Sequence, residues 1–301
     1  MTPLTPKQVA RAIGVSESSL KRWCDRGVIA TVRTAGGHRR IDVAALLAFL
    51  RESGHPVVRP EVIGLPAAIG SGQRTWERSR ARLVEALIAG DEALARQVVF
   101  DLFVSGQSIA SLADQLFHPA MKEIGDRWDC GSAEVYQERR ACEICSRVLF
   151  ELRGAIAEPA PDAPLAMGGT PSGDPYRLPT AIVELVLREA GWRAVSLGSS
   201  LPFETLTAAV AKHQPRMVWL SVSYLEDAAT FIAGYQRFYE SLAPRPAIAL
   251  GGAALTEAVR KELTYAAHCD NMRQLVSFVE SLGMASSATA PLRLHDQGDV
   301  A

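Results

Sequence analysis

Apolar and polar positions alternate in two ways along the second half of the chain. Short apolar runs occur at residues 165–167, 194–197, 217–220 and 247–250. Between these runs apolar residues recur at helical spacing, as they do over 182–187. Short strands that alternate with amphipathic helices are typical of a parallel sheet covered on both faces. The pattern therefore predicts a Rossmann-like parallel-sheet domain over residues 163–284.

The middle of the chain, residues 74–158, has helical periodicity throughout. Four helices are expected, from residue 75 to the Gly90-Asp91 pair, over 92–105, over 108–128 and from 132 to 152. Short connections between amphipathic helices favour antiparallel neighbours. The sequence thus predicts a four-helix bundle ahead of the sheet domain.

Residues 1–55 predict a small domain that begins with two short helices. Thr5 or Pro6 begins the first helix, which ends at Gly14, and Ser16 is a suitable N-cap for a second helix over 17–26. Two short helices joined by a glycine-containing turn form a helix-turn-helix.

A hairpin and a third helix complete this N-terminal domain. Strand candidates at 32–34 and 39–41 flank the Gly36-Gly37 pair, which suits a hairpin turn, and an apolar helix follows over 42–50. The expected fold class is α plus α/β multidomain, with a winged helix-turn-helix, a four-helix bundle and a Rossmann-like domain.

Composition and the remaining segments agree with a globular protein of several domains. The chain has 301 residues, of which 48% are hydrophobic and 22% charged, a length that suits two or three cores. Residues 56–73, which contain three prolines, are expected to form a linker that lets the N-terminal domain swivel, and 285–301 a disordered tail. No signal peptide or membrane span is found, and five scattered cysteines fit a reducing compartment, so a cytoplasmic location is expected.

Charge is distributed unevenly between the first domain and the rest. Residues 1–60 hold ten Lys/Arg and four Asp/Glu, a net charge of +6, while the remainder holds 22 and 29, a net charge of −7. A basic module on an acidic body predicts a polyanionic partner for the first domain alone.

The second helix and the hairpin carry the candidate contacts to double-stranded DNA. Cations neutralise phosphates, and short hydroxyl side chains can approach base edges. The hydroxyls of Ser18 and Ser19 are expected to reach base edges. Backbone contacts are expected from Lys21, Arg22, Arg33, His38, Arg39 and Arg40, with Gly37 in the turn beside them.

The N-terminal domain resembles the winged helix of MerR-type transcription regulators. The resemblance rests on the order of its elements, which are a helix, a Gly-Val-Ser turn, an SSLKRW helix and an R-T-x-G-G-H-R-R hairpin. The resemblance covers nearly all of the first fifty residues. It implies a dimer that binds a pseudo-palindromic promoter through its recognition helix and its wing.

In the sheet domain, the loop 168–179 follows the first strand and is rich in Gly, Pro and Ser. Ligands of open parallel sheets bind just beyond such strand ends, so this loop is the expected small-molecule site. The Ser221-Val222-Ser223 and Gly251-Gly252 segments follow later strands and offer hydroxyl donors and close backbone approach. Cys142 and Cys145 lie within a helix and are interpreted as buried structural thiols, and Cys130 as a more exposed one.

The bundle and the sheet domain together resemble the cobalamin-binding module of methionine synthase-like proteins. Trp128 and Glu138, with nine residues between them, match the Trp-x9-Glu-His motif that caps the corrin in that family. Ser221, Ser223, Gly251 and Gly252 match its cradle for the nucleotide tail. With the MerR-type head, the chain up to Leu282 resembles the CarH/CarA/LitR regulators, which implies a light-responsive repressor that forms dimers or tetramers.

The chain departs from this family at the positions that bear histidine. Asp174 is kept in the loop, but Tyr176 stands at the position of the cobalt-ligating His and Pro179 at that of the Gly. Arg139 replaces the histidine of the bundle motif, and Asp129 follows Trp128 where the photoreceptors have His. Imidazole is a good neutral ligand for cobalt, whereas a phenol with a pKa of about 10 is a poor one.

Three functions follow from these patterns. The first is a DNA-binding regulator, a repressor, whose sensor is cobalamin-independent and takes its input from a separate photosensor protein or from another ligand. The second binds cobalamin or another tetrapyrrole through contacts other than His, in a pocket of Trp128, Glu138, Arg139, Asp174, Tyr176 and the tail cradle. The third is a cobalamin enzyme, which the absence of a further catalytic domain disfavours. No catalytic residue and no metal site is therefore expected.

Overall fold

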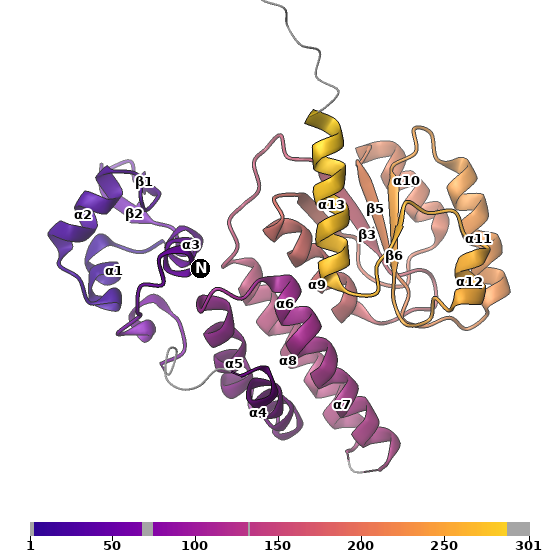
Figure 1. Cartoon of the computed structure of the whole chain (residues 1–301), viewed down its shortest axis with the longest axis horizontal. Helices are drawn as coiled ribbons and strands as arrows, with labels where there is room; N and C mark the ends of the chain where they lie inside the picture. Colours follow the sequence, from indigo (N-terminus) through magenta and orange to yellow (C-terminus); the bar gives the residue numbers. More distant parts are fainter. Residues whose placement is uncertain (1–2, 68–74, 132, 288–301) are drawn as a thin grey trace, which may run out of the picture.

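A computed structural model describes residues 3–67, 75–131 and 133–287 of the chain. Figure 1 shows an N-terminal head, a helical bundle and an α/β domain, with the head and the α/β domain on opposite sides of the bundle. This arrangement confirms the predicted fold class. No helix within the described ranges is both long and apolar enough to cross a membrane.

The head consists of three helices and one hairpin. Its elements are α1 (Pro6–Ile13), α2 (Glu17–Asp25), β1 (Thr31–Arg33), β2 (Arg39–Ile41) and α3 (Val43–Ser53). Thr5 caps α1 in a capping box with Gln8, and Gly14 ends it in the left-handed region. Ser16 caps α2 by accepting a hydrogen bond from the Ser19 amide at 3.0 Å. Local chemistry therefore sets the ends of both helices.

The segment after α3 does not behave as the flexible linker expected over 56–73. The Val58 and Arg59 amides donate to the Ala12 carbonyl of α1 at 2.8 and 2.9 Å. A 3-10 turn, η1 (Pro60–Ile63), packs on α1, and Ile63 and Leu65 are buried. The prediction missed this because the apolar residues here have no helical period; residues 68–73 of the expected linker lie outside the described ranges.

The bundle contains α4 (Trp76–Ala89), α5 (Glu92–Val104), α6 (Ile109–Leu112), α7 (His118–Asp129) and α8 (Val135–Arg153). The single helix expected over 108–128 is interrupted by a π-helical turn, η2 (Ala113–Phe117). Pro119, two residues after this turn, has no N–H to donate to the preceding turn, and a widened turn accommodates that loss. Helix α8 begins later than expected, at Val135, where Glu134 and Gln137 form a capping box; Ser132 is not among the described residues.

The α/β domain has a parallel five-stranded sheet in the order β4-β3-β5-β6-β7. The strands are β3 (Leu165–Gly169), β4 (Arg193–Ser196), β5 (Met217–Ser221), β6 (Ala247–Gly251) and β7 (Ala267–His268). The fifth strand was not predicted, because two residues are too short to show a pattern. In this doubly wound order the topological switch point lies between β3 and β5.

Helices cover both faces of the sheet. They are α9 (Arg177–Glu189), α10 (Phe203–His213), α11 (Ala228–Ser241), α12 (Glu257–Lys261) and α13 (Met272–Ser287). Helices α9 and α13 share one apolar core with the bundle and the head, while α10, α11 and α12 form a second core on the other face. Residues 285–287 of the tail expected over 285–301 belong to α13, and residues 288–301 lie outside the described ranges.

The bundle and α13 are joined at the π-helical turn. The Asp114 carboxylate accepts hydrogen bonds from the Met272 and Arg273 amides, at 2.9 and 3.2 Å. These amides are the first two of α13, so a side chain of the bundle caps the helix and meets the positive end of its dipole. The bundle and the sheet domain are therefore fixed to one another by a polar contact as well as by packing.

Gly168 is expected to be intolerant of any side chain. A Cβ at this buried position in β3 would overlap the Trp219 carbonyl oxygen of β5 and lie 2.5 Å from the indole ring. Gly168→Ala should therefore lower the free energy of unfolding by about 1–3 kcal/mol through overpacking, measured by urea denaturation. Gly283→Ala in α13, where a Cβ meets nothing within 4 Å, is the control and should be neutral or stabilising. Equal stability of the two variants would contradict this packing.

Candidate functional site

Helix α2 presents the predicted base-reading and phosphate-binding side chains to solvent. Ser18, Lys21 and Arg22 are exposed, and Ser19 is half-buried. The Ser19 hydroxyl accepts hydrogen bonds from Ser16 at 2.9 Å and from Arg22 at 3.3 Å, and Lys21 pairs with Glu17 at 3.1 Å. Exposed ion pairs of this kind are weak, so phosphate groups can displace them.

The β1–β2 hairpin forms a wing with a tight turn at its tip. The Thr34 amide donates to the His38 carbonyl at 2.9 Å, and the Gly37 amide donates to the Thr34 carbonyl at 2.8 Å. Gly37 has a φ of 78°, a conformation that favours glycine. Arg33, Gly37 and His38 are exposed, whereas Arg40 is half-buried.

Arg39 is positioned differently from the other predicted DNA contacts. Its guanidinium lies 2.5 Å from the Asp25 carboxylate and 3.4 Å from the Lys21 carbonyl, both in α2. Only 20% of the Arg39 side chain is exposed, and the hydrogen bond to Asp25 raises its pKa above the usual value. Arg39 thus joins the wing to α2 in this structure, and its contact with the DNA backbone stays a prediction. The pairing with Asp25 was not expected, because the two residues are 14 positions apart and no local pattern relates them.

A cavity of about 820 Å³ opens between α8 of the bundle and the start of α9. Its wall combines cations with aromatic and apolar groups, among them Arg139, Phe150, Tyr176, Arg177 and Leu178. Phe150 is 74% exposed and Tyr176 41% exposed, so both rings are accessible to an occupant. This volume is within the range of small-molecule sites.

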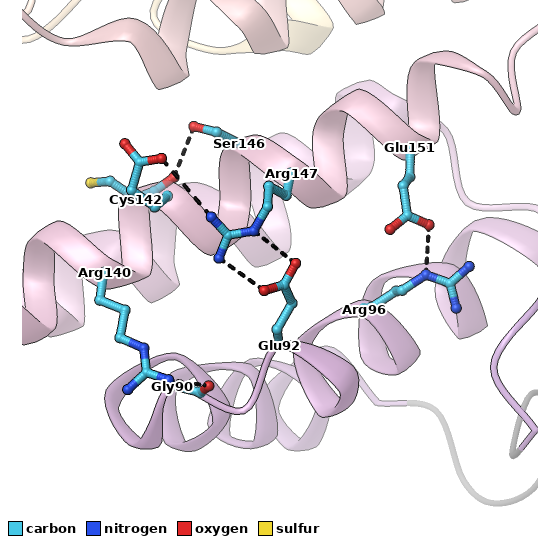
Figure 2. Close-up of polar contacts among 9 residues, drawn as sticks. Gly90, Glu92, Arg96, Arg140, Cys142, Ser146, Arg147 and Glu151 are labelled. Atoms are coloured by element: carbon cyan, nitrogen blue, oxygen red, sulfur yellow. Dashed lines mark hydrogen bonds and ion pairs between the residues drawn. The ribbon is translucent and has the colours of Figure 1, made fainter.

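Polar contacts fix α8 against the N-terminal half of the bundle (Figure 2). Arg147 of the cavity wall forms two hydrogen bonds of 2.8 Å with the Glu92 carboxylate, and Arg140 donates to the Gly90 carbonyl at 3.0 Å. Farther along the helix, Glu151 accepts from Arg96 at 2.6 Å. The bidentate pair holds one wall of the cavity in a defined position.

Of the two α8 cysteines predicted to be buried, Cys145 is buried, whereas Cys142 is half-buried and lines the first cavity. Burial raises the pKa of the Cys142 thiol to about 12, helped by the neighbouring Glu138 carboxylate, and burial raises that of Cys145 to about 12. Both thiols therefore stay protonated near neutral pH and are poor nucleophiles and metal ligands. The part of the chain that the structure describes holds no cluster of three or more His, Cys, Asp or Glu side chains suited to a metal ion.

Asp174 lies at the switch point of the sheet and is fully buried. Its carboxylate accepts hydrogen bonds from three backbone amides, those of Tyr176 at 3.0 Å, Ser223 at 2.6 Å and Tyr224 at 3.2 Å. The loop after β3 is thereby tied to the loop after β5. At this point of the fold an anionic ligand would accept hydrogen bonds from such backbone N–H groups. Here the N–H groups already donate to the Asp174 carboxylate.

A second cavity, of about 520 Å³, lies at the ends of β5 and β6 and includes Ser221, Ser223, Gly251 and Gly252. It shares no lining residue with the first cavity. Trp219, which is buried and lines the second cavity, donates its indole N–H to the hydroxyl of Thr180, which lines the first cavity, at 2.9 Å.

The predicted pocket residues are therefore not all brought together. Arg139 and Tyr176 line the first cavity, whereas Trp128 and Glu138 do not. Glu138 only reaches its edge, where it accepts a hydrogen bond from the Cys142 thiol at 3.6 Å, and Trp128 is 48% exposed in α7. Asp174 lines neither cavity, and its carboxylate is hydrogen-bonded to the loops after β3 and β5.

The donor set does not fit cobalamin held by a histidine. Among the described residues that line the first cavity there is no His, and the phenol of Tyr176 stands in the loop instead. His118 and His268 line the second cavity, but they belong to α7 of the bundle and to β7, not to the loop after β3. Cobalt ligation from the loop after β3 is therefore not supported by the residues present.

Comparison with known proteins gives two family matches on this chain. The helix-turn-helix domain family matches residues 3–54, and the B12 binding domain family matches residues 79–153. The chain is 24% identical over 282 residues to HTH-type transcriptional repressor CarA of Myxococcus xanthus, which covers 90% of this chain and 94% of the relative. It is 27% identical over 270 residues to HTH-type transcriptional repressor CarH of the same organism, which covers 81% of this chain and 87% of the relative.

A solved structure supports the fold of the C-terminal two thirds. The monomethylamine corrinoid protein of Methanosarcina barkeri superposes with a TM-score of 0.58 at 17% identity, and covers 69% of this chain and 100% of that one. At this identity the likeness concerns the fold alone.

Asp174→Asn is expected to destabilise the sheet domain. The substituted side chain keeps only one acceptor oxygen. Its NH2 group faces backbone N–H groups that the second carboxylate oxygen had accepted from, and each donor left unpaired lowers the stability by about 1–3 kcal/mol. Asp227→Asn is the matched control, since Asp227 caps α11 with a hydrogen bond of 2.8 Å from Thr230 and Asn caps equally well. Urea denaturation should separate the two variants; loss of stability in neither would rule out the structural role of Asp174.

Proposed function

This chain is a DNA-binding regulator homologous to the CarA and CarH repressors, with a cobalamin-binding-like module, and we propose that its sensor works without histidine-ligated cobalamin. In this proposal the chain is a MerR-type repressor, without catalytic activity, that binds promoter DNA through α2 and the wing. The observation that carries the proposal is Tyr176, which lines a cavity without any described His.

The head supports sequence-specific DNA binding. Ser18 and Arg22 on α2, together with Arg33 and His38 on the wing, are solvent-accessible. Arg39 and Asp25 hold wing and helix together, so that both elements can meet one DNA duplex at the same time. A single head of this size makes few phosphate contacts, which favours a homodimer or a tetramer as the binding species.

The sensor supports an input other than cobalt chemistry. The Asp174 carboxylate is hydrogen-bonded to the loops after β3 and β5, and the two cavities share no lining residue. Without a cobalt–carbon bond to cleave, control by light would require a separate photosensor protein that docks on the sensor. Light-responsive repression through such a partner is the function we propose.

A second candidate function is a ligand sensor that uses non-histidine contacts. The first cavity has about 820 Å³ of space and is lined by the rings of Phe150 and Tyr176 and by Arg139 and Arg177. Rings stack on a flat chromophore, and guanidinium groups bind carboxylates. Cobalamin held through the phenol and tail pocket, or a linear tetrapyrrole, would fit this description.

Replacing Arg40 by Ala tests the wing. Promoter affinity should fall by a similar factor on every sequence, and the slope of log K against log salt should decrease by about 1, as for one lost phosphate contact. Lys122→Ala, which removes one positive charge from α7, is the control and should leave the slope unchanged. Fluorescence anisotropy over a salt series measures both; an unaltered slope in the Arg40 variant would refute the wing assignment.

Titration with adenosylcobalamin in the dark tests the sensor. The purified chain should give no change in the visible spectrum and no co-elution on gel filtration, because the site offers no imidazole to the metal. Biliverdin and protoporphyrin are titrated in parallel, and a spectral shift with either would favour the second candidate. Retention of cobalamin by the wild type would contradict cobalamin independence; its loss in Tyr176→Phe would then identify the phenol as the ligand.

A further inference from the structure

Helix α9 runs from the sensor cavity to the DNA-binding head. Its first turns line the cavity with Arg177, Leu178, Ala181 and Glu184. Its last residue, Glu189, lies beside α3 of the head and α6 of the bundle. One rigid element thus joins the proposed input site to the proposed output domain.

Both oxygens of the Glu189 carboxylate are used at this junction. One lies 2.8 Å from the Arg51 guanidinium of α3, and the other accepts a hydrogen bond of 2.6 Å from the Ile109 amide at the start of α6. The Glu189 and Arg51 side chains are each 21% exposed, so solvent screens this ion pair less than a surface pair.

Arg51 contacts the bundle as well as α9. Its guanidinium donates to the Gln107 carbonyl at 3.1 Å and lies 4.2 Å above the Phe103 ring. A single side chain of the head therefore contacts the bundle and the sheet domain together. Another contact, from Arg96 to the Gly64 carbonyl at 2.7 Å, holds the segment after the head to the bundle without involving α9.

We propose that the Arg51–Glu189 contact couples the state of the sensor cavity to the orientation of the DNA-binding head. This inference rests on the DNA binding of the proposed function and on the second candidate, in which the first cavity takes a ligand. An occupant that presses on the first turns of α9 shifts the helix, and the shift reaches Glu189 at its other end. The docked head keeps α2 and the wing on the side away from the bundle (Figure 1), so the contact sets the direction of the recognition helix without covering it.

The coupling is specific to the end of α9. Farther back in the helix, Glu184 pairs with Arg153 of α8 at 3.2 Å, and Arg188 pairs with Glu158 at 2.6 Å. These pairs hold α9 within the sensor and do not touch the head. Arg51 and Glu189 are therefore positioning residues, which act on DNA binding through the placement of the head.

The test is a double-mutant cycle between the cavity and the junction. Ala181→Trp, with Leu178→Trp as a second variant, places an indole in the cavity as a stand-in for an occupant. Each is combined with Arg51→Ala and with Glu189→Gln, which keeps an acceptor for the Ile109 amide but removes the charge. Arg96→Ala is the control: it removes the contact with the Gly64 carbonyl, and with it the Glu151 pair of α8, but leaves the contacts of α9 in place. Circular dichroism verifies the fold of every variant.

Binding is measured on a duplex selected from a randomised DNA pool with the wild-type chain. The cavity substitution should change the dissociation constant by about 5-fold or more in the wild-type and Arg96→Ala backgrounds, the usual scale of coupling between sites. In the Arg51→Ala and Glu189→Gln backgrounds the change should fall below about 2-fold. Equal changes in all backgrounds, or no change in the wild type, would overturn the coupling.

Hydrogen exchange provides a readout that does not depend on DNA. The backbone amides of residues 43–53 should exchange faster when the cavity substitution is made in the wild type. In Arg51→Ala they should already exchange faster, and the cavity substitution should cause no further increase. Exchange rates of these amides that do not change on the cavity substitution would also overturn the coupling. If no DNA duplex is selected but the exchange pattern holds, the proposed function fails while the coupling stands.

Discussion

The buried carboxylate of Asp174 is the interaction on which the sensor half depends. It accepts three backbone hydrogen bonds and ties the loop after β3 to the loop after β5. The loop after β3 leads directly into α9, so this tie also determines where Tyr176 and the first turn of α9 lie. A charged group that is removed from water must be fully hydrogen-bonded, which makes this geometry hard to change.

The cavities and the inter-domain contacts follow from where that tie places α9. One part of the helix lines the cavity under α8, another part packs on the sheet near Trp219, and its end meets Arg51 of the head. The bundle is held to the sheet domain through Asp114 at α13, and within the bundle the Arg147–Glu92 pair holds α8 to α5. The three parts of the chain share one apolar core as a result.

The similarity to known repressors extends along most of the chain. The helix-turn-helix family matches its head, the B12 binding domain family matches its bundle, and the CarA repressor is similar over 90% of this chain. The loop that could offer an imidazole presents a phenol, and the space above it is still open.

The sequence by itself determined the three folds, the helix caps and the missing histidine, because periodicity, capping and residue identity are local properties. Gly14, Ser16 and Gly37 act within a few residues of their own positions, so their roles could be predicted. Contacts between distant segments could not be predicted, because they depend on how the chain packs in three dimensions. Only the tertiary structure decided that Arg39 pairs with Asp25, that Trp128 lies away from the cavity and that Arg51 meets Glu189 across 138 positions.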